Sequence, residues 1–169
     1  MGKTLYIIRH SKAKDSDKGS RDIDRELTAE GLQQAARIGA YFNRKNIEID
    51  AMLCSNATRA RQSAELIADR ISYNIAKIKV EEELYEASVR ILENLISTFN
   101  DDWNSVAIVG HNPVLTYFVE YLTEYHFDGM EPGSVVKIAS SACDWNLISQ
   151  ENASFEYYLS PEDLSNNNG

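Results

Sequence analysis

The sequence predicts an α/β fold, a three-layer α/β/α sandwich with a mostly parallel central sheet and antiparallel edge strands near the C-terminus. Two apolar runs, residues 4–8 (TLYII) and 105–109 (SVAIV), are typical of parallel strands that are buried on both faces. Segments with helical spacing of apolar residues alternate with such runs, which indicates parallel strands joined by helical crossovers. Three strand-like segments then follow residue 134 and predict an antiparallel meander.

Length and composition predict an ordinary globular protein. The 169 residues suffice for one core, and we expect a single domain over residues 1–160 with a polar, disordered tail over residues 161–169. The net charge of −9 argues against nucleic acid, which would require a basic face. No apolar run approaches the roughly 20 residues of a membrane span, and the N-terminus lacks the pattern of a secretory signal. We therefore expect a cytoplasmic protein that binds neither nucleic acid nor membrane.

The first part of the chain predicts two strands around a helix. Residues 14–26 are rich in Asp, Ser, Gly, Lys and Arg and predict a mobile loop over the end of the first strand. Thr28 is the expected N-cap of a helix that runs to about residue 43, and residues 50–54 (DAMLC) form the second strand. The inner face of this helix is expected at Leu32, Ala35, Ala36, Gly39 and Phe42.

The middle of the chain predicts two more helices and a third strand. Ser55 or Asn56 is expected to cap the second helix, which continues to about Ile71. Residues 75–83 fit either a short strand or a loop. The apolar positions of the third helix are Val89, Leu92, Ile96 and Phe99, and the strand at residues 105–109 follows.

A fourth helix and the meander complete the chain. Asn112 followed by Pro113 predicts an N-cap and the first residue of a helix. Strands are then expected at residues 135–139, 144–148 and 155–159, with short connections between them.

Basic side chains lie at the ends of all three predicted parallel strands. Arg9 and His10 follow the first strand, Arg59 begins the helix after the second, and His111 follows the third. Right-handed crossovers bring the carboxyl ends of parallel strands to one edge, where ligands bind in open α/β sheets. We therefore expect these side chains to converge, and a basic cluster on an acidic protein indicates a site for an anion.

This combination of side chains suits a phosphoryl group. Arginine pairs with phosphate oxygens and keeps its charge, while helix N-termini add N–H donors. A neutral histidine is a competent nucleophile toward phosphorus, and phosphoryl transfer depends mostly on positioning and charge neutralisation. Such a site requires no metal and no cofactor.

Five groups of residues together form a recognisable pattern. In chain order they are Arg9-His10 with Lys12-Ala13, then Asp24-Arg25 with Leu27-Thr28 and Gly31, then Ser55 with Arg59-Ala60 and Gln62-Ser63-Ala64, then Leu84-Tyr85-Glu86, and finally Gly110-His111-Asn112-Pro113. On this pattern, which spans most of the chain, the sequence resembles the histidine phosphatase superfamily, also called phosphoglycerate mutase-like. Within it, the chain is most similar to the small SixA-type phosphohistidine phosphatases.

The resemblance implies a role for each of the four basic residues. His10 would be phosphorylated on a ring nitrogen during turnover, and water would then hydrolyse the phosphohistidine. Arg9, Arg59 and His111 would surround the phosphoryl group. We expect the other ring nitrogen of His10 to donate to a backbone carbonyl and so to determine the tautomer.

Three further residues are candidates for the site. Arg25 would fold over the pocket as another phosphate contact, and Ser11, where many members have glycine, would add a hydroxyl donor. Glu86 occupies the place of the acid that protonates the leaving group in larger relatives, although arginines nearby would lower its pKa, and His111 is the other candidate donor. The short segment between Arg59 and Glu86 leaves no room for the lid of larger relatives. An open pocket is therefore expected, suited to a phosphorylated side chain of another protein.

Simpler interpretations exist for single residues. His111 could merely cap its helix, and Arg59 could be a solvated helix residue, as is expected of Arg61 and of His126. A metal site formed by His10, His111 and an aspartate of the first loop is the rival chemistry. The adjacent arginine disfavours a cation, and metal-type spacing is absent from the sequence.

Three functions follow from the sequence. The favoured one is a metal-independent phosphatase that uses His10 to remove phosphate from phosphohistidine on a signalling protein, such as a histidine phosphotransfer domain. The second keeps this mechanism but acts on a small phosphomonoester. The third is a phosphate-binding module without turnover.

Overall fold

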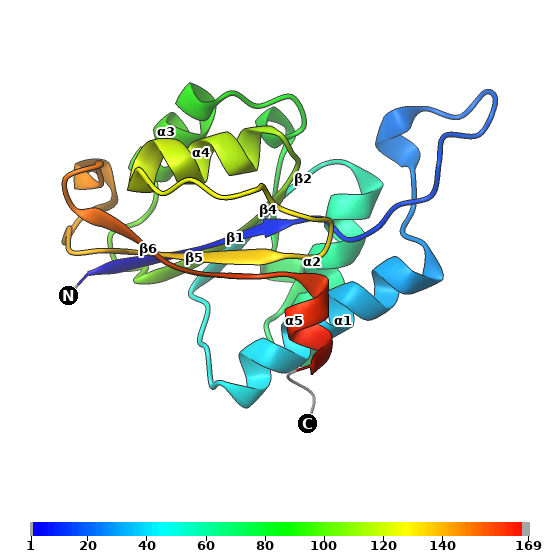
Figure 1. Cartoon of the computed structure of the whole chain (residues 1–169), viewed down its shortest axis with the longest axis horizontal. Helices are drawn as coiled ribbons and strands as arrows, with labels where there is room; N and C mark the ends of the chain where they lie inside the picture. Colours follow the sequence, from blue (N-terminus) through cyan, green and yellow to red (C-terminus); the bar gives the residue numbers. More distant parts are fainter. Residues whose placement is uncertain (1, 167–169) are drawn as a thin grey trace.

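One mixed sheet of six strands, in the order β3-β2-β4-β1-β5-β6, forms the centre of the part of the chain that the structure describes, residues 2–166 of a computed structural model (Figure 1). Strands β1 to β4 are parallel, and β5 and β6 are antiparallel to their neighbours. The strands are β1 (Lys3–Arg9), β2 (Ala51–Ser55), β3 (Lys79–Glu81), β4 (Ser105–Gly110), β5 (Val135–Ser140) and β6 (Ala153–Leu159). The helices are α1 (Ala29–Arg44), α2 (Thr58–Arg70), α3 (Val89–Ser97), α4 (Val114–Thr123) and α5 (Pro161–Asn166).

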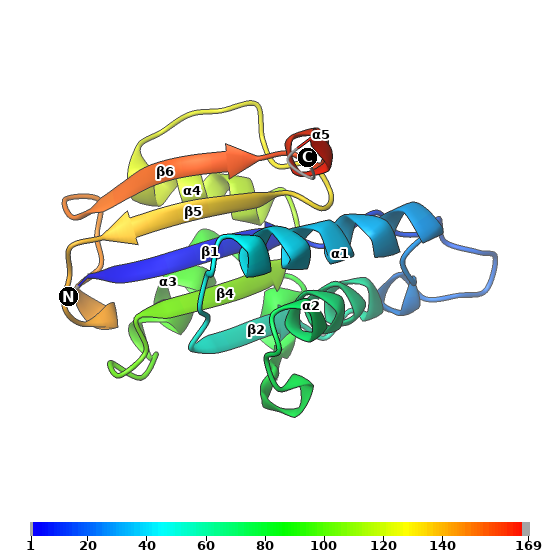
Figure 2. The same ribbon diagram turned by 90° about the horizontal axis from the view of Figure 1, so that it is seen from below.

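Helices cover both faces of this sheet, so the predicted three-layer α/β fold is confirmed. Figures 1 and 2 show α3 and α4 on one face and α1, α2 and α5 on the other. The side chains of β1 alternate between the two layers, because Ile7 belongs to the core under α3 and α4, whereas Ile8 belongs to the core under α1 and α2. Each layer thus buries its own apolar cluster, as the alternation of a pleated strand requires.

Strand β1 lies at the centre of the molecule because it pairs on both sides. Its parallel register with β4 sets Arg9 opposite Gly110, so the residues that follow the two strands, His10 and His111, leave the sheet side by side. The backbone N–H of His10 continues this ladder by donating to the carbonyl of Gly110 at 3.0 Å. The parallel pairing of the two backbones is therefore sufficient to bring the two histidines together.

Helix α1 begins where the sequence predicts, but its buried face differs. The Oγ1 of Thr28 caps it by accepting from the N–H of Gly31 at 2.9 Å. The assignment of Leu32 to the inner face is wrong, because this side chain is 43% exposed. Gly31 packs against the backbone of Lys12, where a Cβ would lie 2.1 Å from the carbonyl oxygen. This close approach turns the helix so that Ile38, rather than Leu32, faces the core.

The predicted caps of α2 and α4 are also wrong. Helix α2 begins after Ala57 and α4 after Pro113, in both cases without a side-chain cap. The side chain of Asn112 instead donates to the carbonyl of Met130 at 2.9 Å and accepts from Thr116 at 3.1 Å. It thus ties the start of α4 to the loop before β5.

The strand predicted at residues 144–148 is not formed. A short 3-10 helix, Trp145–Leu147, takes its place, and the β5 strand pairs directly with β6. The buried Trp145 donates from its backbone N–H to Asp101 at 2.9 Å and from its indole to the carbonyl of Trp103 at 2.8 Å. These bonds hold the segment against the loop before β4, where it cannot join a ladder.

The structure corrects part of the prediction that residues 161–169 form a disordered tail. Residues 161–166 form α5, in which Leu164 is only 1% exposed and packs into the core under α1 and α2. The Oγ of Ser160 accepts from the backbone N–H of Asp163 at 3.1 Å and so stabilises the start of this helix. Disorder is therefore wrong for these residues, whereas residues 167–169 lie outside the described range. The single-domain organisation over residues 1–160 stays a prediction.

No helix within residues 2–166 combines the length and the apolar character that crossing a bilayer demands.

Candidate active site

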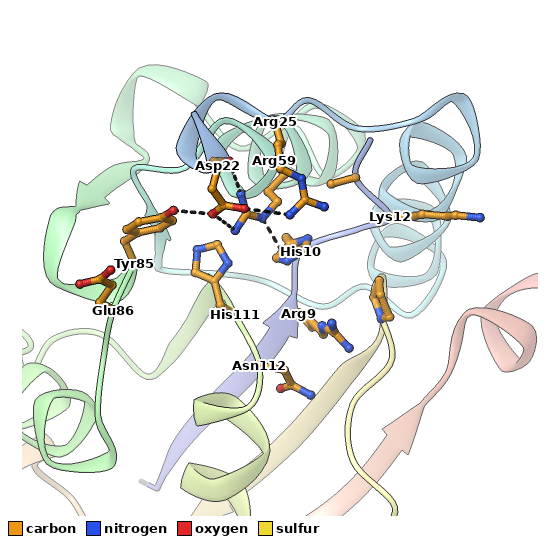
Figure 3. Close-up of a pocket in the computed structure, with 12 residues that line it drawn as sticks. Arg9, His10, Lys12, Asp22, Arg25, Arg59, Tyr85, Glu86, His111 and Asn112 are labelled. Atoms are coloured by element: carbon orange, nitrogen blue, oxygen red, sulfur yellow. Dashed lines mark hydrogen bonds and ion pairs between the residues drawn. The ribbon is translucent and has the colours of Figure 1, made fainter. Parts of the chain in front are cut away.

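A cavity of about 480 Å³ lies at the carboxyl ends of β1, β2 and β4 (Figure 3). Its lining includes six of the seven residues that the sequence predicts for the site: Arg9, His10, Arg25, Arg59, Glu86 and His111. These residues come from five separate parts of the chain. The predicted convergence at one edge of the sheet is therefore observed.

His10 is held in one orientation by a backbone contact. Its Nδ1 lies 2.7 Å from the carbonyl oxygen of Ser11, so Nδ1 carries the proton and donates it to that oxygen. The other nitrogen, Nε2, carries the lone pair and accepts a hydrogen bond from the Nε of Arg59 at 3.4 Å. Burial, together with the positive charges of Arg59 and Arg9, lowers the pKa of His10 to about 4. The ring is therefore neutral at pH 7, as a nucleophile must be.

His111 lies beside His10, with 5.1 Å between the ring centroids. Its Nε2 contacts the Oγ of Ser55 at 2.8 Å, whereas its Nδ1 is buried and has no partner among the described residues. Burial and the neighbouring His10 and Arg59 lower the pKa of His111 to about 3. The cavity thus holds two neutral imidazoles side by side.

Arg59 is buried, although its position in the first turn of α2 would suit a solvated side chain. Its Nη1 donates to the carbonyl of Asp22 at 2.9 Å and its Nη2 to the Asp22 carboxylate at 3.1 Å. The guanidinium also lies over the ring of Tyr85, 5.9 Å from the centroid. The interpretation of Arg59 as a surface residue is therefore wrong, whereas Arg61 is exposed as expected.

Arg9 reaches the cavity from the end of β1. Its Nη1 donates to the carbonyl of Met130 at 2.7 Å, and its Nε is buried without a partner among the described residues. The turn at Gly133 supports this strand end, because its N–H donates to the carbonyls of Arg9 and His10. Gly133 has a φ of +76°, and a Cβ there would lie 2.8 Å from the Oε1 of Gln34, so only glycine fits.

Sequence reasoning missed Asp22, which lies among the arginines. Its carboxylate accepts from Arg25 at 2.9 Å, from Arg59 and from the hydroxyl of Tyr85. The Tyr85 hydrogen bond, followed by that of Arg25, lowers the pKa of Asp22 below its usual range. Arginines at positions 21 and 25 on either side of this acid were the only signal available, and it is weak.

The three remaining predicted residues lie at different positions relative to the cavity. Arg25 lies over it and also donates from Nε to the carbonyl of Lys14 at 2.6 Å. Glu86 is exposed at the rim, and in Figure 3 its carboxylate points away from both histidines. Ser11 is fully buried, does not line the cavity, and has an Oγ without a partner among the described residues. The structure therefore does not bring the Ser11 hydroxyl to the site.

A second, more apolar groove of about 400 Å³ continues from the cavity. The two share Tyr85, Glu86, His111 and Asn112, and the groove then runs between the segment before α3 and the start of α4. Its further lining includes Val89, Val114 and Tyr117, and the last of these is 58% exposed.

The donor set of the cavity is suited to an anion with several oxygens. The guanidinium groups of Arg9, Arg25 and Arg59, the Nε2 of His10 and the unpartnered Nδ1 of His111 surround one space. Within residues 2–166, no group of three or more His, Cys, Asp or Glu side chains is arranged to hold a metal ion. Guanidinium donors can neutralise the charge of a phosphoryl group, and a neutral imidazole beside them can attack its phosphorus.

Comparison with protein families finds one model, "Histidine phosphatase superfamily (branch 1)", which matches residues 5–100. An uncharacterized protein of Mycobacterium tuberculosis is 34% identical over 106 residues, which are 63% of this chain and 63% of that protein. The chain thus covers less than two thirds of the length of this relative.

Two solved structures share the fold over nearly their whole length. The protein histidine phosphatase SixA complexed with tungstate superposes with a TM-score of 0.80 at 24% identity, over 95% of this chain and 99% of that one. A SixA structure from Agrobacterium tumefaciens gives 0.81 at 23% identity, with the same coverage.

Proposed function

The chain belongs to the histidine phosphatase superfamily, branch 1, and we propose that it is a metal-independent phosphatase that works through a phosphohistidine intermediate on His10. The orientation and the tautomer of the His10 ring support this proposal most directly. Its Nδ1–H donates to the carbonyl of Ser11 at 2.7 Å, so the lone pair is on Nε2, where it accepts a 3.4 Å hydrogen bond from Arg59 that a phosphoryl group would displace.

The reaction has two displacement steps. In the first, the Nε2 lone pair of His10 attacks phosphorus, and the bond from phosphorus to the leaving group breaks on the opposite side. The carbonyl of Ser11 stabilises the ring as it becomes positive. In the second, a water oxygen attacks phosphorus, the N–P bond breaks and its electron pair returns to Nε2. Inorganic phosphate leaves, and His10 is neutral again.

Three neighbours would neutralise the charge on the phosphoryl oxygens. Arg9 offers a buried Nε without a partner, and His111 offers its unpartnered Nδ1. Arg59 would exchange its contacts with Asp22 for phosphoryl oxygens. Each such donor is worth several kcal/mol to the transition state, on the order of 2.7–4 kcal/mol.

The proton donor to the leaving group is proposed to be Glu86. It stands at the rim that the cavity shares with the groove, where a leaving group would depart. A rotation of its exposed side chain would bring the carboxyl group to that position. His111, which lines the same rim, is the other candidate donor.

The proposed substrate is phosphohistidine on a signalling or phosphotransfer protein. Within residues 2–166 the cavity is open to solvent, and the apolar groove gives room for residues beside the phosphorylated side chain. The likeness to SixA, whose structure holds a tungstate ion, supports a phosphate-sized site in this fold. Turnover of a phosphorylated histidine phosphotransfer domain, compared with a panel of small phosphomonoesters, separates this substrate from the small-molecule alternative.

Rapid quench with a ³²P-labelled phosphoprotein tests the intermediate. We expect acid-labile label on the wild-type chain and none on His10→Ala. His126→Ala is the matched control, because His126 is an exposed histidine outside the cavity lining, and it should be labelled like the wild type. Label on His10→Ala would show that the nucleophile is misassigned. Oxyanion binding without any phosphoenzyme in the wild type would favour a binding module instead.

A further inference from the structure

Ser55 is the last residue of β2 and is fully buried behind His111. Its Oγ accepts from the backbone N–H of Ala57 at 3.1 Å and lies 2.8 Å from the Nε2 of His111. No other acceptor for its hydroxyl proton is found among the described residues. The direction of the Ser55–His111 bond therefore decides where the proton of His111 is.

A count of donors and acceptors settles this direction. If Nε2 carried the proton, the Ser55 oxygen would accept twice and its own proton would be buried without an acceptor. If Nε2 is the acceptor, the hydroxyl donates to His111 and accepts from Ala57, so both of its functions are used. A buried polar group left unpaired costs about 1–3 kcal/mol, so the second arrangement is favoured.

We propose that Ser55 is a positioning residue that holds neutral His111 in the Nδ1–H tautomer, so that His111 serves as a hydrogen-bond donor to a phosphoryl oxygen. This inference rests on the proposed function and adds to it a residue that never touches the substrate. The Nδ1 of His111 is buried and has no partner among the described residues, as expected of a donor that binds a ligand oxygen.

The two histidines then carry their protons on the same atom and use them in opposite ways. His10 donates Nδ1–H to the backbone and presents a lone pair to phosphorus. His111 accepts at Nε2 and presents Nδ1–H. Figure 3 shows the His111 ring between Tyr85 and His10 at the cavity. A neutral donor suits this position, since a second positive charge beside His10 would disfavour the positive ring that forms there during the attack.

Nitrogen NMR tests the tautomer without any need for turnover. The chain has three histidines, so long-range ¹H–¹⁵N spectra can be assigned with His126→Ala and His10→Ala. At pH 7 we expect His111 to be protonated on Nδ1 in the wild type and to populate the Nε2–H form in Ser55→Ala. A proton on Nε2 in the wild type, or an unchanged tautomer in the variant, would overturn the inference.

Binding of inorganic phosphate and of tungstate provides the second measurement. Ser55→Ala should weaken both by about tenfold, the effect of one impaired hydrogen bond to a charged group. Ser140→Ala is the matched control, because the Oγ of Ser140 also accepts from the backbone N–H two residues ahead, at 3.1 Å, but far from the cavity. It should leave the tautomer and both affinities unchanged, and thermal unfolding of the two variants checks that each is folded. Equal affinities for the wild type and Ser55→Ala would contradict the proposal. An inactive wild type with the expected tautomer would count against the phosphatase, and not against Ser55.

Discussion

His10 and His111 are buried as neutral rings, and this has a consequence for stability. Their pKa values of about 4 and about 3 lie below the ordinary value of 6.5. Between pH 6.5 and 4 the unfolded chain binds a proton at each of these residues, whereas the folded chain does not. Lowering the pH through this window therefore lowers the free energy of unfolding. Above pH 6.5 neither the folded nor the unfolded chain binds these protons, so the two histidines no longer make that free energy depend on pH.

This effect can be isolated with His10→Gln. We expect the variant to lose less of its free energy of unfolding between pH 7.5 and pH 5 than the wild type does, by on the order of 1–2 kcal/mol. Urea unfolding at the two pH values measures the difference. His126→Gln changes an exposed histidine and should follow the wild type. An equal pH dependence in His10→Gln and the wild type would show that the His10 ring is not kept neutral by the fold.

Asp22 places a negative charge in a cavity that is otherwise suited to an anion. Its carboxylate accepts from Arg25 and Arg59, the latter at 3.1 Å, and so competes with a phosphoryl group for the same donors. We expect Asp22→Asn to bind inorganic phosphate about tenfold more tightly, because removing one charge at close range is worth about 1 kcal/mol or more.

Asp24→Asn is the matched control for this prediction. Asp24 belongs to the same short 3-10 helix but pairs with the exposed Arg21 at 2.7 Å, outside the cavity lining. Its replacement should leave phosphate affinity unchanged when both variants are titrated calorimetrically. Weaker binding by Asp22→Asn would mean instead that the carboxylate mainly orients the arginines.

At the scale of elements, α1 shows how a close backbone contact sets the phase of a helix. Its buried positions include Gly31 and Ile38, and Leu32 points outward. Ile38→Ala should lower the free energy of unfolding by about 2–5 kcal/mol, because the side chain is fully buried. Leu32→Ala should lower it by less than about 1 kcal/mol. Urea unfolding of the two variants provides the comparison, and equal losses would mean that the helix is rotated from the phase described.

The loop between β1 and α1 is held over the cavity by long-range contacts rather than by its own structure. Its Asp22 reaches Arg59 on α2 and Tyr85 before α3, which lie 37 and 63 residues away in the chain. The loop forms no regular element beyond the 3-10 helix Asp22–Asp24 and a bridge between Ala13 and Leu27. Residues that are charged and lack periodicity thus become part of the cavity through tertiary contacts alone.

At the scale of the whole molecule, the groove beside the cavity predicts a difference between large and small substrates. Tyr117 on α4 lines this groove and is 58% exposed, whereas Tyr121, one turn later, is 44% exposed and does not line it. Tyr117→Ala should lower kcat/KM for a phosphohistidine protein by about tenfold, since burying an aromatic side chain contributes roughly 1.5–3 kcal/mol. It should leave the hydrolysis of a small phosphoramidate unchanged.

Tyr121→Ala separates this effect from a general disturbance of α4. We expect it to match the wild type toward both substrates in steady-state assays. If Tyr117→Ala slowed both substrates equally, the groove would contribute to catalysis rather than to recognition of the protein substrate. If it slowed neither, the groove would have no part in binding.

Sequence patterns alone predict the α/β class, the order of most elements and the convergence of Arg9, His10, Arg59 and His111. These follow from local signals, because apolar periodicity defines each element and right-handed crossovers bring parallel strand ends to one edge. The family pattern is likewise carried by short motifs. Even so, the strand predicted at residues 144–148 failed, since the bonds of Trp145 to distant loop residues outweigh its local preference.

The contacts that refine the site depend on the packing of the folded chain. Ser55 meets His111 across 56 residues, and Asp22 meets Tyr85 across 63. Neither pair has a spacing or a periodicity that a sequence could reveal, because each depends on the path of loops after the sheet is assembled. The physical reason is that a hydrogen bond needs atoms to meet within about 3 Å. Strand and helix patterns specify which edge a residue reaches, but the partner it finds there depends on how the whole chain packs.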